Sequence, residues 1–576
     1  MKSHKNPKIL FILFAILISF ASLHSAQASQ SEAQFDVVIL NGRLVDGTGN
    51  PWFYGDIGIL RDRIVRITPA GRLKNALSHE RIDAKGFTVA PGFIDIQSHS
   101  RGDFLTGDGR VISKVTQGIT TEILGEGWTN APANELTLSM YDSVDPEARR
   151  LTKEFTGTRG FNNWLEAMQK HGTSPNFGSF LGATTVRMYV KGMAPGAPTA
   201  EELVTMCELM RNAMQDGAFG LATALIYPPG NFATTEELVE LAKAMEPYSG
   251  IYITHLRSEA DKFLDGIDEA IEIGRKGGVP VEIYHLKAGG RRNWYKMPLA
   301  IARINAARAE GLDIGANMYP YIAGSTGLVA CIPPWASADG KLTENLTDPE
   351  MRQKIHDEIL NQKTEWENLG YLATPDGVLV LGLEKPENKQ YIGKRLSEIA
   401  AIQGKDWVDT AIDLILSENQ SIGTIYFMMT EENLKLQMRQ PWIKFGTDAG
   451  GADPDNPQEL VHPRSYGTYT RILGKYVREE RVMTIEDAIR KMTSAVAKRL
   501  KIRDRGQLQE GFYADVVIFD PNTISDRATF ENPHQLSVGI HYVFVNGTAV
   551  IKNGKPTGAL PGRIVRGPGY VKHRKH

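Results

Sequence analysis

Short runs of apolar, β-branched residues alternate with amphipathic stretches over most of this chain. The strand-like runs lie near 89–97, 119–125, 177–183, 219–224, 251–256, 280–286, 312–318 and 443–447. Helical patterns separate most of them, and one begins with Thr199 three residues before Glu202, the spacing of a capping box. Alternation of this kind is typical of parallel α/β folds, and eight strands close a barrel. We predict a (β/α)8 barrel over residues 88–500.

The two ends of the chain have a different texture. Residues 35–67 and 511–556 alternate short strand-like runs with Gly, Asp and Asn turns, which predicts β-hairpins. We expect 29–87 and 501–565 to form one small β-sandwich domain. The basic segment that follows, 566–576, is expected to be a solvated tail.

One connection in the predicted barrel is far longer than an ordinary crossover. Residues 327–440 lie between strands seven and eight and contain two helical patterns, DPEMRQKIHDEIL and DWVDTAIDLIL. We predict an inserted subdomain at the barrel mouth, where it would act as a lid or shape the substrate pocket.

The first 28 residues have the pattern of a secretory signal peptide: basic MKSHKNPK, apolar ILFILFAILISF and the cleavage sequence Ala-Gln-Ala at 26–28. The apolar core is shorter than the roughly 20 residues of a spanning helix. We therefore predict export to a periplasm or the medium, without membrane attachment after cleavage. The formal net charge of −2 gives no basis for nucleic-acid binding. Cys207 and Cys331 could pair, but Cys207 lies in an amphipathic helix and is expected to pack as an apolar residue.

Three histidines follow predicted strands directly: His99, His255 and His285. Active sites of α/β barrels lie at the C-terminal ends of the strands. A single histidine there is as compatible with packing as with ligation, but three together favour metal ligands. Glu126, between two glycines after the second strand, is the expected further ligand. Glu122 is a rival within that strand, where its side chain could face either side.

Charged residues accompany these histidines. Arg257 and Lys287 each follow a histidine by two residues, and Asp448 ends the eighth strand. If the sixth strand continued, Lys287 would share the face of His285. We predict that Arg257 contacts a small-molecule substrate.

The sequence resembles the N-acyl-D-amino-acid deacylases (D-aminoacylases) of the amidohydrolase superfamily over roughly residues 35–565. The motifs are PGFID and SH within 91–99, GxxTALIYPPG at 220–230, THLRSE at 254–259, HLKAGGRRNW at 285–294, YPYIAGST at 319–326, GTDAGG at 446–451 and HPRSYGTY at 462–469. The resemblance implies a zinc-dependent enzyme that hydrolyses a C–N amide bond, converting N-acyl-D-amino acids to a D-amino acid and a carboxylate.

The resemblance also implies roles for particular residues. His255 and His285 would hold the tightly bound zinc, with Asp448 as catalytic acid and base. Lys287 and Arg464 would hold the substrate carboxylate. Tyr319 and Ser325 would line the scissile amide, where the Tyr319 hydroxyl could donate a hydrogen bond to the developing oxyanion.

This chain departs from the family pattern at two positions. The first strand normally ends in His-x-His, but Gln97, a weak ligand, stands in place of the first histidine. Glu126 replaces the cysteine of the D-aminoacylases, which hardens the site. We therefore expect one functional zinc, with at most a weak second site at His99 and Gln97. The fourth strand, FGLATALIY, has no lysine to carbamylate, which argues against a hydantoinase-like binuclear centre.

Two other functions are compatible with these residues. The first is an exported dipeptidase or isopeptidase for peptides with a D-residue, which needs a roomier pocket shaped by 327–440. The second is a metal-binding protein without catalysis, suggested by Gln97. The presence of Asp448, His255 and His285 speaks against this second alternative.

Overall fold

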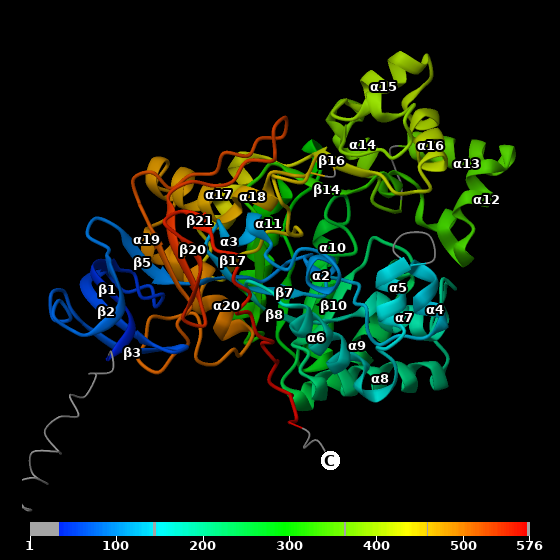
Figure 1. The fold of residues 1–576 in the computed structure, drawn as a ribbon. Coiled ribbons are helices and arrows are strands. Elements are labelled where there is room, and N and C mark those ends of the chain that lie inside the picture. The colour runs from blue at the N-terminus through cyan, green and yellow to red at the C-terminus, as the bar shows by residue number, and fades with distance from the viewer. Residues whose placement is uncertain (1–33, 142–145, 362–364, 458, 573–576) are drawn as a thin grey trace, which may run out of the picture.

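The computed structural model describes residues 34–141, 146–361, 365–457 and 459–572 (Figure 1). The predicted signal peptide at 1–28 lies outside the described residues. Helices and strands are mixed along the chain, so the predicted α/β class is confirmed. In the part of the chain described here, no helix is both long and apolar enough to cross a membrane. Cys207 and Cys331 are buried and form no disulfide with each other.

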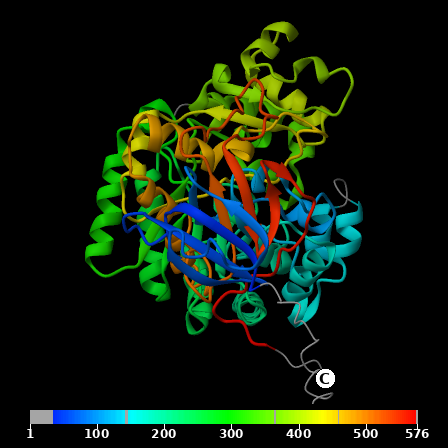
Figure 2. The same ribbon diagram turned by 60° about the vertical axis from the view of Figure 1, so that its left-hand side comes forward.

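Strands from both ends of the chain join in one nine-stranded sheet. The order is β21-β20-β19-β18-β5-β1-β2-β3, with β4 beside β1. Its strands are β1 (Phe35–Leu44), β2 (Phe53–Leu60), β3 (Arg63–Pro69), β4 (Ser78–Asp83), β5 (Thr88–Pro91), β18 (Val516–Phe519), β19 (Ile540–Val545), β20 (Thr548–Lys552) and β21 (Lys555–Pro556). Figure 2 shows the blue N-terminal strands beside the red C-terminal ones. β5 joins the two sets, since it pairs parallel with β1 and antiparallel with β18.

A second set of strands is entirely parallel and forms a ring. The pairs run β6-β7-β8 and β9-β10-β11-β12-β13-β17. These strands are β6 (Phe93–Asp95), β7 (Ile119–Leu124), β8 (Asn176–Ser179), β9 (Leu181–Gly182), β10 (Gly220–Ala224), β11 (Ile251–His255), β12 (Val281–Ile283), β13 (Ile314–Met318) and β17 (Ile443–Phe445). β8 and β9 are two parts of one extended segment interrupted at Phe180. A parallel bridge from Ser98 to Ala449 joins the last strand to the first.

Helices connect successive strands of this ring, and three more follow its last strand. The longer ones are α6 (Gly160–His171), α7 (Ala183–Lys191), α8 (Ala200–Asp216), α9 (Thr235–Met245), α10 (Phe263–Gly277), α11 (Lys296–Ala309), α17 (Glu431–Met438), α18 (Arg464–Arg471) and α19 (Ile485–Met492), and the short α2 (Arg101–Leu105), α3 (Ile112–Val115), α4 (Glu135–Leu138), α5 (Pro146–Thr152) and α20 (Ser494–Arg499) accompany them. The predicted capping box at α8 is confirmed, because Thr199 accepts from Glu202 N and Glu202 accepts from Thr199 N. α18 continues into a π-helix at Ile472–Glu479.

A group of helices and a small sheet separates β13 from β17. The antiparallel strands β14 (Ala323–Gly327), β16 (Gly423–Phe427) and β15 (Val378–Val380) carry the helices α12 (Leu342–Thr347), α13 (Pro349–Leu360), α14 (Leu369–Ala373), α15 (Leu396–Gln403) and α16 (Trp407–Ser417). Most of these helices project at the upper right of Figure 1. The two helical patterns predicted within 327–440 are confirmed as α13 and α16. The sheet begins at Ala323, slightly earlier than expected.

Two predicted strands have different limits in the structure. The run 89–97 divides at Gly92 between β5 and β6, and glycine is needed at this position because a Cβ there would lie 2.1 Å from the Thr120 hydroxyl oxygen. The run 280–286 ends at Ile283, and His285 has a positive φ of 30°. Lys287 therefore does not lie on a continuing strand, and that prediction is wrong.

A buried lysine lies beneath the junction of the first and last ring strands. Lys114 Nζ donates to Asp95 Oδ2 at 2.9 Å and to Thr447 Oγ1 at 2.5 Å. Asp95 Oδ1 in turn accepts from Thr447 N at 2.8 Å. The Lys114 and Asp95 side chains are both fully buried. This ion pair therefore joins α3, β6 and the segment after β17.

Replacing Lys114 with Met should lower the free energy of unfolding by about 3–5 kcal/mol, because it leaves the buried Asp95 carboxylate without its cation. Guanidinium denaturation followed by circular dichroism measures the change. Lys243→Met removes an exposed ion pair with Glu240 and is the matched control; it should change stability by less than about 0.5 kcal/mol. Equal effects of both substitutions would contradict this account of the junction.

Candidate metal centre and active site

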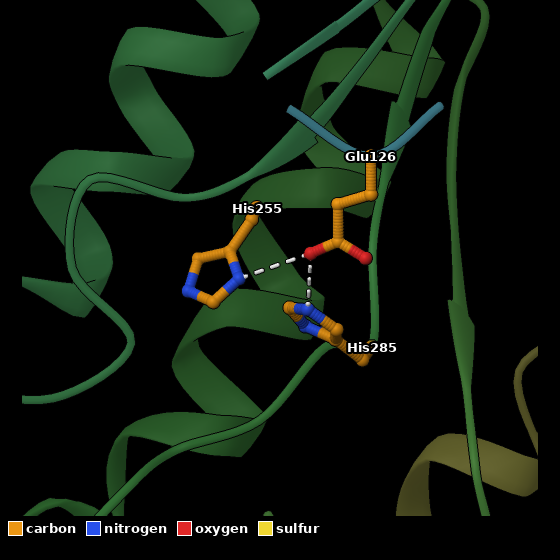
Figure 3. A group of neighbouring side chains, drawn as sticks. All are labelled: Glu126, His255 and His285. Atoms are coloured by element: carbon orange, nitrogen blue, oxygen red, sulfur yellow. Dashed lines mark hydrogen bonds and ion pairs between the residues drawn. The ribbon is translucent and has the colours of Figure 1, made fainter. Parts of the chain in front are cut away.

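The three residues predicted as zinc ligands come together at the ends of neighbouring ring strands. Glu126 Oε1 lies 3.2 Å from His255 Nδ1 and 3.1 Å from His285 Nε2 (Figure 3). One ligand atom from each lies within 4.8 Å of the others, which is close enough to share one ion. Gly127 has a φ of 63°, and a Cβ there would lie 2.7 Å from Ala224 Cβ. Glycine is therefore needed beside Glu126 for the segment to approach β10.

A second group of possible ligands shares Glu126. His99 Nε2 lies 2.9 Å from Asp448 Oδ1 and 3.4 Å from Glu126 Oε2. Between the two carboxylates, Gln97 Nε2 donates to Glu126 Oε2 at 2.5 Å and to Asp448 Oδ1 at 3.0 Å. A primary amide has two N–H donors, so both are used here. Gln97 therefore links the two carboxylates by hydrogen bonds, at the edge of the candidate second site.

Both carboxylates are held in the charged form. Burial raises the pKa of Glu126, but the charge on His285 and hydrogen bonds from the histidines hold it well below its usual range. Burial also raises the pKa of Asp448, but the Arg464 guanidinium lowers it below its usual value. Arg464 Nη1 lies 2.6 Å from Asp448 Oδ2.

Two residues of the site have a strained backbone: His285 and Asp448 have positive φ values of 30° and 52°. Such backbone strain is concentrated at functional sites.

Sequence reasoning missed Glu259, which lies behind the two histidines of the candidate metal centre. Its Oε1 lies 2.9 Å from His285 Nδ1, and its Oε2 lies 3.3 Å from His255 Nε2 and 2.5 Å from Lys287 Nζ. The carboxylate therefore contacts the ring nitrogen of each histidine that faces away from Glu126. Contacts of this kind fix the tautomer and orientation of metal ligands. Its position four residues after His255, in the motif THLRSE, is the sequence feature that could have indicated this contact.

Lys287 and Arg464 line the cavity, each beside a carboxylate of the protein. Lys287 is buried against Glu259, and its Nζ also lies 2.8 Å from His285 Nδ1. The Arg464 guanidinium stacks over the Tyr319 ring at 4.7 Å and pairs with Asp448. Both side chains can reach a substrate in the cavity, but each is already bound to an acidic residue.

The other predicted substrate residues have different surroundings. The Tyr319 ring is buried, and its hydroxyl lies 4.0 Å from Met429 Sδ. The Ser325 hydroxyl donates to Thr424 O at 2.9 Å, so its proton is used within the small sheet. Both residues line the cavity.

Arg257 lies outside the lining of this cavity, which differs from the predicted substrate contact. The reason is Glu269, whose carboxylate accepts from Nε and Nη2, while carbonyl oxygens of Asn231 and Ala233 accept the remaining bonds. The rival ligand Glu122 also lies elsewhere. It accepts hydrogen bonds from the Ser98 and Ser100 hydroxyls, on the side of Lys114.

The candidate ligands Glu126, His255 and His285 open, together with His99 and Asp448, into one cavity of about 600 Å³. Besides the metal-ligand candidates, its wall includes Glu367 and Leu369 of the segment between β13 and β17 and Trp128 after β7. Glu367 Oε2 accepts from Glu259 N at 2.5 Å, which connects the insertion to the layer behind the histidines. A pocket of this size holds a substrate larger than a single amino acid.

A D-aminoacylase from Alcaligenes xylosoxydans xylosoxydans is 34% identical over 540 residues, which cover 93% of this chain and 99% of that protein. The chain belongs to the N-acyl-D-amino-acid deacylase (D-aminoacylase) family. The predicted resemblance is therefore confirmed. Residues 393–551 also match a family model described as "Amidohydrolase family".

Two solved structures of D-aminoacylase family proteins have the same fold. N-acyl-D-glutamate deacylase from Bordetella bronchiseptica, complexed with zinc and a phosphonate inhibitor that mimics the tetrahedral intermediate, is 31% identical with a TM-score of 0.75. The match covers 92% of this chain and 99% of that one. The second structure is a D-aminoacylase with a binuclear metal centre, for which one-metal activation and second-metal attenuation are reported. It is also 31% identical with a TM-score of 0.75, and the match covers 92% of this chain and 100% of that one.

In this member of the D-aminoacylase family, Glu259→Gln should weaken zinc binding about 10- to 100-fold, because it removes the charge that orients both histidines. Competition with a chromogenic chelator measures the affinity directly, without reliance on activity. Glu272→Gln, which removes an exposed pair with Lys276, is the matched control and should leave the affinity unchanged. An unaltered affinity in Glu259→Gln would show that the histidines are oriented without it.

Proposed function

We propose that this protein hydrolyses N-acyl-D-amino acids to a D-amino acid and a carboxylate, using one zinc ion held by Glu126, His255 and His285. The observation that carries the proposal is the meeting of these three residues, with Asp448 beside them, in a cavity of a D-aminoacylase family member. Two imidazoles and one carboxylate fit a catalytic zinc with an open fourth position. When bound, zinc polarises the scissile carbonyl and lowers the pKa of water toward neutrality.

Asp448 is the proposed proton carrier. Its lowered pKa keeps it ionised at neutral pH, so it can accept the proton of the attacking water and return it to the leaving amine. Arg464 and Lys287 hold the substrate carboxylate, which fixes the amide relative to Asp448. The Tyr319 hydroxyl donates to the developing oxyanion, a contribution of about 3 kcal/mol.

Gln97 is the reason to propose a single functional zinc. Its amide donates to the carboxylates of Glu126 and Asp448, two of the three residues of the second candidate group. A related D-aminoacylase has a binuclear centre. A neutral amide that occupies both carboxylates leaves His99 with weakened partners, so a second ion binds poorly.

We further propose that the parallel ring is a (β/α)8 barrel within 88–500, with 327–440 as an inserted subdomain. We also propose that the nine-stranded sheet belongs to a small β-sandwich domain formed by 29–87 and 501–565. The ring order and the bridge from Ser98 to Ala449 support the barrel. The composition of residues 1–28 supports export, so the enzyme would act in the periplasm or the medium.

The decisive test is amine release by the zinc-loaded protein from a panel of N-acetyl D- and L-amino acids and D-containing dipeptides. We expect turnover of the acetylated D-amino acids and little of their L-enantiomers. Turnover confined to dipeptides would overturn the deacylase proposal in favour of a peptidase. The control is Asp448→Asn, which should lower kcat by about 10²–10⁴-fold while one zinc per chain is retained.

Gln97→His should create a second metal site by restoring an imidazole beside His99 and removing the amide from the carboxylates. We expect zinc bound per chain to rise from about one to about two, measured by plasma emission spectroscopy after dialysis. Gln97→Leu serves as the control, because it removes the amide without supplying a ligand. A stoichiometry of two in the unaltered protein would refute the single-metal proposal.

A further inference from the structure

A second, smaller cavity adjoins the active-site cavity. It has a volume of about 240 Å³. The two cavities share part of their walls, namely Ile226, Tyr227, Pro228, Thr326 and Glu367. The second cavity is therefore next to the metal-ligand candidates and is not a separate surface pocket.

Most of the residues that line this second cavity are apolar, and its polar ones are Asn231, Arg257, Thr326, Ser337, Glu365 and Glu367. Leu225 comes from the segment after β10, while Val329, Ala330, Ile332 and Pro334 come from the start of the insertion. Arg257 also borders it, but its guanidinium is already bound by Glu269 and by two backbone carbonyls. The room is therefore suited to an apolar group of a ligand.

Two of the residues shared by the cavities are held together by a hydrogen bond. The Tyr227 hydroxyl donates to Thr326 Oγ1 at 3.0 Å, and both residues line both cavities. The Tyr227 ring packs edge-on against the His255 imidazole, with ring centroids 5.5 Å apart. Tyr227 and Thr326 therefore form part of the wall that the two cavities share, beside a candidate zinc ligand.

The ring order gives the direction in which a substrate would lie. Tyr227 follows β10, whereas Asp448, which pairs with Arg464, follows β17. β10 and β17 are separated by β11, β12 and β13, so the two residues lie on opposite sides of the ring. An N-acyl amino acid is linear in the order carboxylate, Cα, amide and acyl chain. With its carboxylate at Arg464 and its amide at the zinc site, the acyl chain points toward Tyr227.

We propose that the second cavity is an acyl-chain subsite, and that the preferred substrates are N-acyl-D-amino acids with unbranched apolar acyl chains longer than acetyl. This proposal rests on the proposed deacylase function and names the class of acyl group that it removes. The chain enters past Tyr227 and Thr326 and is covered by Val329 and Ala330 of the insertion.

The test compares N-acetyl-, N-butanoyl-, N-hexanoyl- and N-decanoyl-D-leucine. We expect kcat/KM to rise about fourfold for each methylene that becomes buried, up to hexanoyl, and then to level off. Equal values for all four acyl chains would overturn the proposal while leaving the deacylase function intact. A preference for 6-aminohexanoyl over hexanoyl would also overturn it, in favour of a cation bound by Glu367.

Filling the cavity provides the matched variant. Ala330→Phe should reduce the ratio of hexanoyl to acetyl kcat/KM to about one, whereas Ala401→Phe, on the exposed surface of α15, should leave the ratio unchanged. The ratio of hexanoyl to acetyl binding affinity is measured in the same way, by calorimetry on the zinc-loaded Asp448→Asn variant with and without Ala330→Phe. If no acylated D-leucine is cleaved, the series is repeated with the D-amino acid best cleaved in the panel above, and the binding ratio still decides the subsite. A ratio that Ala330→Phe does not change would refute it.

Discussion

Carboxylates buried in one cavity repel each other, and the rest of this site offsets that repulsion. Glu126, Glu259 and Asp448 all reach the same cavity with little exposure to solvent. Each is paired: the first with two imidazoles, the second with Lys287 and the third with Arg464. A fourth carboxyl, Glu367, is different. Burial and the negative charge of Glu259 raise its pKa to about 8, and the more weakly acting Lys287 does not offset them. A buried carboxyl group that lacks a dominant cationic partner is stabilised in its protonated, neutral form.

This arrangement explains why positions around the metal ligands differ in chemistry. Gln97 supplies N–H donors to two carboxylates at once without adding charge, which a neutral imidazole, with one N–H, could not do. Glu259 supplies negative charge behind both histidines, where an amide would leave Lys287 without its partner. The segment between β13 and β17 contributes Glu367 to the same network through the backbone of Glu259. The candidate metal centre and this segment are thus connected by one hydrogen-bonded path.

The sequence predicts much of this molecule because apolar strands that end in charged residues are local signals. His255, His285, Glu126 and Asp448 were placed in one site on that basis, and the structure brings them together. Contacts between distant segments were not predictable in the same way. Glu259 lies in a loop without periodicity, and Arg257 is turned away by Glu269, twelve residues further along the chain. The end of β12 before His285 depends on local backbone strain, which composition does not reveal.

The nine-stranded sheet ties the two ends of the chain to the ring. β5 is flanked by β1 and by β18, and only Gly92 separates it from β6, which carries Asp95 toward the buried Lys114. During synthesis β5 therefore has an open edge until residues beyond 516 leave the ribosome. Such an edge can pair with other chains. Loss of roughly the last 60 residues would thus leave β5 with an unpaired, aggregation-prone edge directly beside the first strand of the ring, so a chain truncated at its C-terminus lacks part of the sheet and is also prone to pair with other chains.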